Sequence, residues 1–308
     1  MRVTVLYGGP SAEREVSLVS GKAVIDGLTS MGHEVFASDV SPTELSGLDH
    51  PHDVIFPVLH GQFGESGELQ EILEQRRLAF VGSGSKASRL GMDKVETKKA
   101  WQRAGLPTPA YRVIRRGEPV PEMPGPCVVK AISSGSSIDV HVCRAAPECP
   151  PDGAQAAVRA VLAKHPEALI EQFIDGAELT VGLLEEEPLA PIRIVAKREF
   201  FDYEAKYKAN DTEHRFDTGL PNEVVSICRQ LAKKANAVVG ARDLARVDVM
   251  LDAQYNPYLL EINTLPGFTP KSLLPEAAAH GGIAFGPLVD RLVRRAFDRH
   301  KNAKASAA

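Results

Sequence analysis

Two strand-like segments near the C-terminus carry four polar side chains that could bind a metal ion. The stretch from Arg246 to Gly267 reads RVDVMLDAQYNPYLLEINTLPG, with two apolar runs separated by turn residues. Because strand side chains alternate between faces, Arg246 and Asp248 share one face of the first run, and Glu261 and Asn263 share one face of the second. Two carboxylates and an amide oxygen are hard ligands of the kind that Mg²⁺ takes beside phosphate oxygens.

The apolar side chains of this hairpin predict which face packs on the core. Leu260 and Ile262 are expected to face the core with Val247 and Val249, which leaves Leu259 on the polar face. The alternative interpretation is a water-facing surface with cross-strand polar pairs, which is common in antiparallel sheets. The pattern alone leaves both interpretations open.

A second group of residues could bind phosphate, although the sequence has no P-loop and no glycine-rich dinucleotide motif after the first strand. Lys130 ends the run CVVK and precedes the turn AISSGSS, which offers one cation and several backbone N–H donors. Lys94 in GMDK and Lys206 in DYEAKY could supply further cations. The alternatives are a plain hairpin turn and solvated surface lysines.

The segment LIEQFIDGAE is predicted to be a strand that leaves one domain for the next. Backbone groups between Glu171 and Ile174 could pair with the edge of an adenine, and a following acid could bind ribose hydroxyls. An ordinary edge strand fits the same pattern equally well.

Composition and charge limit the class of protein. The chain has 308 residues, 44% of them apolar and 25% charged, with a net charge of −4, so no basic surface for nucleic acid is predicted. The N-terminus begins with a strand-like run rather than a secretory signal, and no apolar segment is long enough to span a membrane. The cysteines lack zinc-site spacing and are expected to be idle thiols in the cytoplasm: Cys127, Cys143, Cys149 and Cys228.

Strands and helices alternate over the first ninety residues, which predicts a parallel sheet with ligand groups at the carboxyl ends of its strands. The expected strands are VTVLY, HEVFASDV, DVIFPVLHG and LAFVG, and the helices are EREVSLVSGKAVIDGL and ELQEILEQ. Two glycine-rich segments, YGGPSAERE and HGQFGESG, follow the first and third strands. These segments are candidates for ligand contacts.

The rest of the chain predicts two α+β units. One helix is expected over SRLGMDKVETKKAWQRAG, followed by a compact unit of strands and one helix up to residue 175. Further strands, a polar stretch DYEAKYKANDTEHRFDTG, a helix from Glu223 to Val239, the hairpin and a last helix with a frayed tail KNAKASAA follow. We therefore predict three domains, at residues 1–89, 90–175 and 176–308.

The ordered set of motifs resembles the D-alanine–D-alanine ligases of the ATP-grasp superfamily. The motifs are GGPSAEREVS, HGQFGESG, GMDK, GSS, DYEAKY, RVDVM and LLEINTLPG, and the resemblance covers nearly the whole chain in the same order. It implies an α/β (α+β) ATP-grasp fold: an N-terminal Rossmann-like parallel-sheet domain that binds substrate, and two α+β domains that clamp the nucleotide.

The resemblance also implies the reaction, which makes D-alanyl-D-alanine for peptidoglycan from two D-alanines and ATP. ATP phosphorylates the carboxylate of the first D-alanine, the amine of the second attacks the acyl phosphate, and a tetrahedral intermediate expels phosphate. The implied cofactors are two Mg²⁺ ions, with Mn²⁺ as an alternative. A cytoplasmic homodimer is expected, with D-alanine and ATP as its partners and neither nucleic acid nor membrane.

Site residues carry over from the family motif by motif. The ATP contacts implied are Lys94, Lys130, Glu171, Phe173, Ile174, Glu178 and Lys206, and the metal ligands implied are Asp248, Glu261 and Asn263. The first D-alanine is expected to bind Glu13 and His60, and the second Ser272 and Leu273. Arg246 and the backbone N–H of Gly267 are expected to stabilise the oxyanion, and Ser136 and Tyr207 to link to Glu13 and close a loop over the site.

Three positions depart from the family pattern. Ala131 stands where the family usually has Pro, Asp139 where it usually has Gly, and Ser66 where it more often has Asp. Asp139 would place an extra carboxylate near the phosphates.

Two rival functions remain. A related ligase would make D-alanyl-D-serine or D-alanyl-D-lactate, but Tyr207 favours the dipeptide over the ester. A nucleotide-binding regulator without catalysis is disfavoured because the cation and metal positions are all present.

Overall fold

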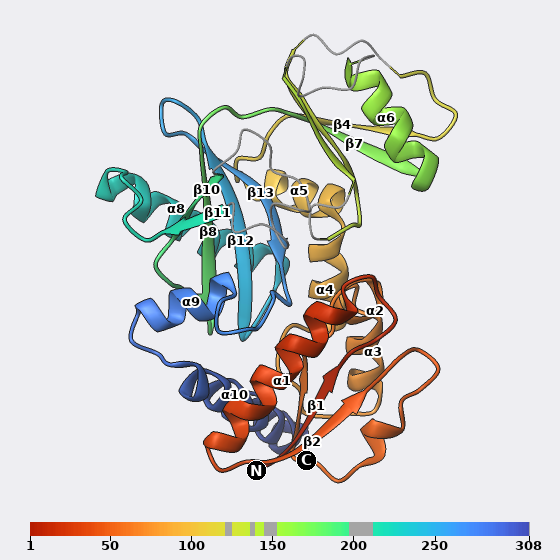
Figure 1. The fold of residues 1–308 in the computed structure, drawn as a ribbon, viewed down its shortest axis with the longest axis vertical. Coiled ribbons are helices and arrows are strands. Elements are labelled where there is room, and N and C mark those ends of the chain that lie inside the picture. The colour runs from red at the N-terminus through yellow and green to blue at the C-terminus, as the bar shows by residue number, and fades with distance from the viewer. Residues whose placement is uncertain (121–124, 136–138, 145–152, 197–211, 308) are drawn as a thin grey trace.

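The computed structural model describes residues 1–120, 125–135, 139–144, 153–196 and 212–307. The N-terminal region forms a parallel sheet, which lies at the bottom of Figure 1. Its strand order is β2 (Glu34–Asp39), β1 (Arg2–Tyr7) and β3 (Val54–Pro57). The helices of this region are α1 (Arg14–Ser30), α2 (Gln62–Glu65) and α3 (Glu68–Gln75), with a 3₁₀ turn, η1 (Ser46–Asp49).

The fourth strand expected at LAFVG is wrong as a full strand. Phe80 makes only an isolated parallel bridge to Ile55. The chain turns at Gly82, whose φ is +100°, so the segment ends before it can form a longer ladder.

The single helix expected over residues 88–105 is also wrong, because the structure has two. Helix α4 (Ser85–Met92) ends at Asp93, and α5 (Lys94–Arg103) begins immediately after it. Asp93 has extended backbone angles, and its side chain accepts the backbone N–H groups of Val95 and Glu96, each at 2.9 Å. This N-cap starts a new helix whose first residue is Lys94.

The central region is an antiparallel sheet with one covering helix, at the top of Figure 1. Its order is β4 (Tyr111–Arg115), β7 (Glu167–Gln172), β5 (Cys127–Ala131) and β6 (Val140–Cys143). Helix α6 (Gly153–Lys164) packs on it through a compact apolar cluster that includes Val129 and Val158. Strand β4 was not predicted from the sequence.

The C-terminal region supplies the six-stranded sheet in the middle of the molecule. Its order is β11 (Thr212–Arg215), β10 (Ile192–Ala196), β8 (Ala177–Leu184), β12 (Leu244–Leu251) and β13 (Pro257–Asn263), with β9 (Glu187–Pro188) paired to β8. Helix α8 (Asn222–Val239) packs on the apolar face of this sheet, so the opposite face is left for polar side chains.

The last two helices return to the N-terminal sheet. After α9 (Leu273–His280), helix α10 (Phe285–Ala307) lies beside α1 (Figure 1), and its apolar side chains share a core with the N-terminal strands. The tail expected to fray continues this helix to Ala307 instead. Part of the region 176–308 therefore packs against the region 1–89.

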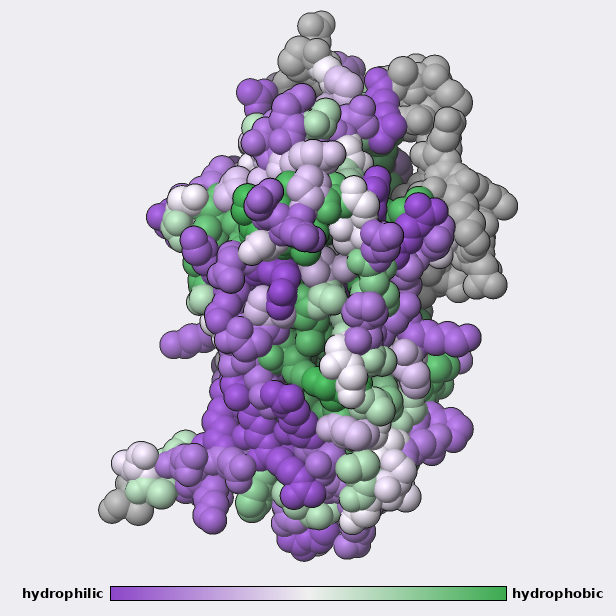
Figure 2. Space-filling view, turned by 90° about the vertical axis from the view of Figure 1, so that its left-hand side faces the viewer, coloured by the Kyte–Doolittle hydropathy of each residue, from purple (hydrophilic) through white to green (hydrophobic). Residues whose placement is uncertain are grey.

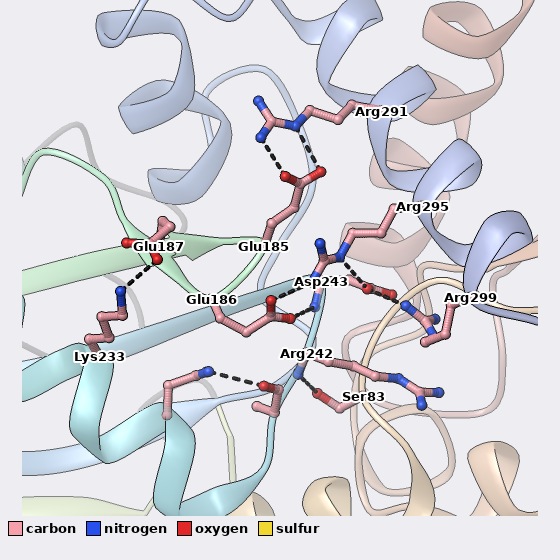
Figure 3. Close-up of polar contacts among 12 residues, drawn as sticks. Ser83, Glu185, Glu186, Glu187, Lys233, Arg242, Asp243, Arg291, Arg295 and Arg299 are labelled. Atoms are coloured by element: carbon pink, nitrogen blue, oxygen red, sulfur yellow. Dashed lines mark hydrogen bonds and ion pairs between the residues drawn. The ribbon is translucent and has the colours of Figure 1, made fainter. Parts of the chain in front are cut away.

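A set of charged residues lies at this junction, and we call it the joint cluster (Figure 3): Glu185, Glu186, Arg242, Asp243, Arg291, Arg295 and Arg299. Asp243 is fully buried, accepts the backbone N–H of Gly82 at 2.8 Å, and pairs with Arg295 and Arg299. Arg299 also donates to the carbonyl oxygen of Phe80 at 2.8 Å. The cluster ties α10 and the start of β12 to the segment after the N-terminal sheet.

The surface in one view is mostly hydrophilic. Figure 2 shows the face on the left of Figure 1, where hydrophilic residues cover most of the surface and hydrophobic residues gather in one strip. Among the described residues, no helix is both long enough and apolar enough to cross a membrane. Cys127, Cys143 and Cys228 are buried, and Cys149 lies outside the described residues.

Candidate active site

The β12–β13 hairpin presents its four polar residues on one face, as predicted. Asp248 lies directly opposite Glu261, and Arg246 directly opposite Asn263. The expected core positions are partly wrong, because the register shifts by one residue after Asp248. Leu259 is buried beside Ile262 and Leu260 is the extra residue, since a β-bulge reverses the alternation of the strand.

Asp248 is held by two neighbours on that face. Arg246 donates to both of its carboxylate oxygens, from Nε at 3.0 Å and from Nη2 at 2.9 Å. Thr180 on β8, opposite Asp248 in the sheet, donates its hydroxyl to Oδ1 at 2.6 Å. Thr180 was not predicted from the sequence, because its type and strand position carry no signal of their own. These bonds fix the direction of a carboxylate on the sheet face opposite α8.

The donor set of this face fits Mg²⁺. No three His, Cys, Asp or Glu side chains group as metal ligands in the part of the chain that the structure describes. Two carboxylates and the Asn263 amide are nevertheless hard oxygen donors on adjacent strands, and Asn263 Oδ1 already accepts the N–H of Leu265 at 2.9 Å. Such a partial set suits an ion that completes its shell with phosphate and water oxygens.

Helix α5 directs two lysines toward this face, one turn apart. Lys94 Nζ lies 3.3 Å from Glu261 Oε2. It also donates to the carbonyl oxygen of Ser134 at 2.8 Å, in the turn AISSGSS at the end of β5, which we call the small-residue turn. Lys98 Nζ lies 2.5 Å from Glu171 Oε1, and Lys130 contacts the other oxygen of Glu171. We call Lys98, Glu171 and Lys130 the lysine–glutamate triad. Lys98 was not predicted from the sequence to be part of the site.

Burial and charge act against each other in this triad. Burial alone would lower the pKa of Lys130, but the charges of Glu171, Glu261 and Asp248 outweigh it and raise that pKa. Burial lowers the pKa of Lys98 to about 8, although Glu171 opposes the shift. Burial would raise the pKa of Glu171, but the two lysines outweigh it and lower that pKa. The two oxygens of the Glu171 carboxylate are therefore occupied by the two lysines.

A second polar group lies at the N-terminal end of the site. A Cβ atom added to Gly135 would lie 3.6 Å from Glu13 Oε2 and 3.9 Å from Glu65 Oε2, so both carboxylates face the small-residue turn. His60 Nδ1 lies 3.0 Å from Glu65 Oε1. Burial raises the pKa of Glu65 despite the bond from His60.

His60 also has an unsatisfied ring atom. Its Nε2 is buried and has no hydrogen-bond partner among the described residues. A buried polar atom without a partner costs free energy, which points to a ligand at this position. Glu13 and His60 were predicted from the sequence, but Glu65 was not, although its place in the HGQFGESG motif was a signal.

The segment before α9 brings three further predicted residues together. A Cβ added to Gly267 would lie 3.3 Å from Ser272 Oγ, so these two residues are neighbours. Ser272 precedes the helix, Leu273 begins it, and Ser272 Oγ accepts the backbone N–H of Thr269 at 3.0 Å. A helix N-terminus with free N–H groups suits a carboxylate ligand.

Of the residues expected to face adenosine, Phe173 and Ile174 follow β7 directly. Ile174 is buried and Phe173 is half-buried under the guanidinium of Arg144, which lies 4.1 Å from the ring centroid. A cavity of about 620 Å³ opens here, with Phe173, Arg144 and Glu171 in its lining. Glu178 lies on β8 opposite Met250, on the face that carries Asp248.

Known proteins resemble this chain over most of its length. The family model described as D-ala D-ala ligase C-terminus matches residues 100–294. The D-alanine–D-alanine ligase of Gloeobacter violaceus is 42% identical over 307 residues, which are 97% of this chain and 100% of that protein. The chain belongs to the D-alanine–D-alanine ligase family.

Solved structures of ligases from this family have the same fold. The Bacillus anthracis D-alanine–D-alanine ligase superposes with a TM-score of 0.84 at 30% identity, over 98% of this chain and 99% of that one. Its complex with ATP also gives 0.84, at 28% identity and the same coverage. The ATP-grasp fold is therefore confirmed, and family membership makes the chain an ATP-dependent ligase.

Two further groups of positions were taken from the family pattern: three predicted site residues, and the departure at Asp139. Ser136, Lys206 and Tyr207 lie outside the described residues. Asp139, where the family usually has Gly, has a φ of +56°, and its carboxylate accepts Lys164 Nζ at 2.6 Å and contacts His165 Nε2 at 2.8 Å. This carboxylate is therefore bound to the end of α6, so the expectation of an extra acid near the phosphates loses its support.

Proposed function

We propose that this member of the family joins two D-alanines at the polar face of the β12–β13 hairpin, with ATP bound between that face and the lysine–glutamate triad. One observation carries the proposal: Asp248 and Glu261 lie side by side, facing Lys94 and Lys130 from α5 and β5. Cations on one side and metal-ligating carboxylates on the other are what a triphosphate needs.

On this face, the lysines would bind the nucleotide and the carboxylates would bind the metal ions. Lys94 and Lys130 would contact the phosphates from the side of the small-residue turn, and Lys206 would contact the γ-phosphate. Asp248, Glu261 and Asn263 would hold two Mg²⁺ ions, with Mn²⁺ as a substitute. Bound there, the ions neutralise phosphate charge and act as Lewis acids on the transferred group. The adenosine would lie against Phe173, Ile174, Glu178 and the backbone of Glu171.

The first D-alanine would lie between the N-terminal region and the small-residue turn. Glu13 would pair with its ammonium, and His60 with its carboxylate. The unsatisfied Nε2 of His60 supports this role, because the contact of Nδ1 with Glu65 leaves Nε2 buried without a partner among the described residues. Glu65 would hold the ring in that orientation.

The second D-alanine would approach from the side of α9. Ser272 and the backbone of Leu273 would bind its carboxylate, which directs its amine toward the activated first residue. Arg246 and the N–H of Gly267 would stabilise the oxygen that gains charge in the tetrahedral intermediate. Ser136 and Tyr207 would link to Glu13 and keep water from the acyl phosphate. Tyr207 favours an amine over a hydroxyl as the second nucleophile, which disfavours D-alanyl-D-lactate. The alternative products to test are D-alanyl-D-serine and D-alanyl-D-lactate.

Product analysis tests this function. The chain is incubated with ATP, Mg²⁺ and either D-alanine, L-alanine, D-serine or D-lactate, and ADP and ligated product are quantified together. We expect one ADP per D-alanyl-D-alanine and little product with L-alanine. ATP turnover without ligated product would contradict the proposal.

The substitution Glu261→Gln tests the metal assignment. It removes one ligand charge, so turnover is expected to fall by roughly 10²–10³-fold, the scale of lost electrostatic stabilisation. Glu68→Gln on the exposed side of α3 is the matched control and should leave turnover unchanged. Wild-type turnover in Glu261→Gln would show that this carboxylate does not hold a metal.

The wider setting is also part of the proposal. ATP and D-alanine are available together in the cytoplasm, and related ligases are commonly dimers, so we place the chain there as a homodimer that binds neither nucleic acid nor membrane. Light scattering after size exclusion measures the oligomeric state, with a mass near twice 33.2 kDa expected.

A further inference from the structure

Lys98 is a fully buried cation at the back of the candidate site. Its side chain is 0% exposed, whereas that of Lys94, one helical turn earlier, is 9% exposed. Its ammonium lies 2.5 Å from Glu171 Oε1, donates to Thr108 Oγ1 at 2.6 Å, and lies 5.9 Å from the ring centroid of Tyr111. A buried charge is costly even when paired, so a position that keeps one calls for an explanation.

The electrostatics of the triad suggest what Lys98 does. Glu171 carries one negative charge, and Lys98 and Lys130 each contact one of its oxygens. With both lysines protonated, the triad has a net charge of +1. Without Lys98, the Glu171 carboxylate would neutralise Lys130 one to one, and little positive charge would remain for a phosphate.

The contacts of Thr108 add a mechanical link to the hairpin. Its hydroxyl accepts from Lys98 and donates to the carbonyl oxygen of Leu259 at 2.8 Å. The N–H of Leu259 in turn donates to the carbonyl oxygen of Pro107 at 2.9 Å. Leu259 adjoins the β-bulge of β13, two residues before Glu261. Lys98 therefore joins the triad to the strand that carries a proposed metal ligand.

We infer that Lys98 is a positioning residue for the nucleotide: it holds Glu171 from behind, so that Lys130 keeps its direction and its net positive charge for a phosphate of ATP. This inference rests on the proposed function, because it takes Lys130 as a phosphate ligand. Lys98 itself touches neither the nucleotide nor the reacting atoms.

A dependence on pH follows from the surroundings of Lys98. The charged and titratable groups that face it are Glu171 from β7, Lys130 from β5, Glu261 from β13 and Tyr111 from β4. Since burial lowers its pKa to about 8, Lys98 loses its proton as the pH rises through that value. The triad then has no net charge, so the Kd for ATP should increase between pH 7 and pH 9.

Three variants separate charge from packing. Lys98→Met keeps most of the volume and removes the charge, and Lys98→Arg keeps the charge. Lys99→Met is the matched control, because Lys99 is adjacent, 45% exposed and paired with Glu96 on the surface. We expect Lys98→Met to raise the KM for ATP by roughly ten- to a hundredfold, the scale of a lost charge-assisted hydrogen bond, with kcat within about twofold. Lys98→Arg and Lys99→Met should stay close to wild type.

The outcomes distinguish this inference from the proposed function. An unchanged KM for ATP in Lys98→Met, or an equal rise in Lys98→Arg, would overturn it. If Lys98→Met does not fold, calorimetry of ATP binding decides: the Kd of the wild type should rise through pH 8 and that of Lys98→Arg should not, and equal rises would refute the inference. If the wild type and Lys99→Met form no dipeptide, the proposed function fails, while the calorimetric comparison still tests Lys98.

Discussion

Glu171 and Asp243 are both buried carboxylates that two cations share, and they lie in different parts of the molecule. Glu171 is 2% exposed between Lys98 and Lys130, and Asp243 is 0% exposed between Arg295 and Arg299. The partners differ in kind, because lysine is a point charge and arginine is a rigid fork with several donors.

The cations also differ in what else they contact. In the joint cluster, each of the two arginines that pair with Asp243 has a second acceptor: Arg295 pairs with Glu186, and Arg299 donates to the carbonyl oxygen of Phe80. Lys130 has Glu171 as its sole ion-pair partner among the described residues, so its ammonium retains donors. Cations that each bind two protein acceptors connect elements of the fold, whereas a cation that binds one protein acceptor can take a ligand as its next partner. We therefore assign the joint cluster to stability and the lysine–glutamate triad to the nucleotide.

The largest expected effect is on stability, in the joint cluster. Asp243→Asn keeps an acceptor for the Gly82 N–H but leaves Arg295 and Arg299 without their shared carboxylate. Breaking a buried pair typically costs about 3–5 kcal/mol, and we expect the lower end because the two arginines are 36% and 29% exposed. Urea unfolding measures this loss, and kcat at a permissive temperature should be unchanged. A normal unfolding midpoint combined with low kcat would reverse the assignment.

The next largest effect is on catalysis, at the hairpin. Arg246→Ala should lower kcat by about 10²–10³-fold with little change in the KM for ATP, because its proposed contact strengthens in the transition state. Arg299→Ala is the matched arginine of the joint cluster and should leave kcat unchanged. Steady-state kinetics with both substrates varied checks this. If Arg246→Ala raised KM alone, Arg246 would be a ground-state contact.

The polar face of the hairpin could be predicted because period-two alternation is a local property of the strand. The bulge could not, since YLLEI is apolar at three consecutive positions and either leucine could face the core. Packing against α8 decides that Leu259 does so. The break between α4 and α5 was predictable in principle, because Asp93 is a strong N-cap, but the apolar spacing continues across it.

The lysine–glutamate triad lay beyond sequence reasoning for a different reason. Lys98 and Lys99 are adjacent and identical in type, yet one is fully buried and the other is 45% exposed. Only the approach of β7 to α5 distinguishes them, and that is a long-range contact. The same holds for Thr180, because its bond to Asp248 joins two residues that are 68 positions apart in the chain.

Ligand-induced thermal stabilisation tests the division between the two clusters most directly. Melting temperatures of the wild type, Lys130→Met and Arg299→Met are measured with and without ATP and Mg²⁺. Binding stabilises the folded state by RT ln(1 + [L]/Kd), so a tenfold weaker Kd removes about 1.4 kcal/mol at saturating ligand. We predict that Arg299→Met melts earlier but keeps the wild-type increment, whereas Lys130→Met loses much of the increment. Equal increments in Lys130→Met and the wild type would contradict the account.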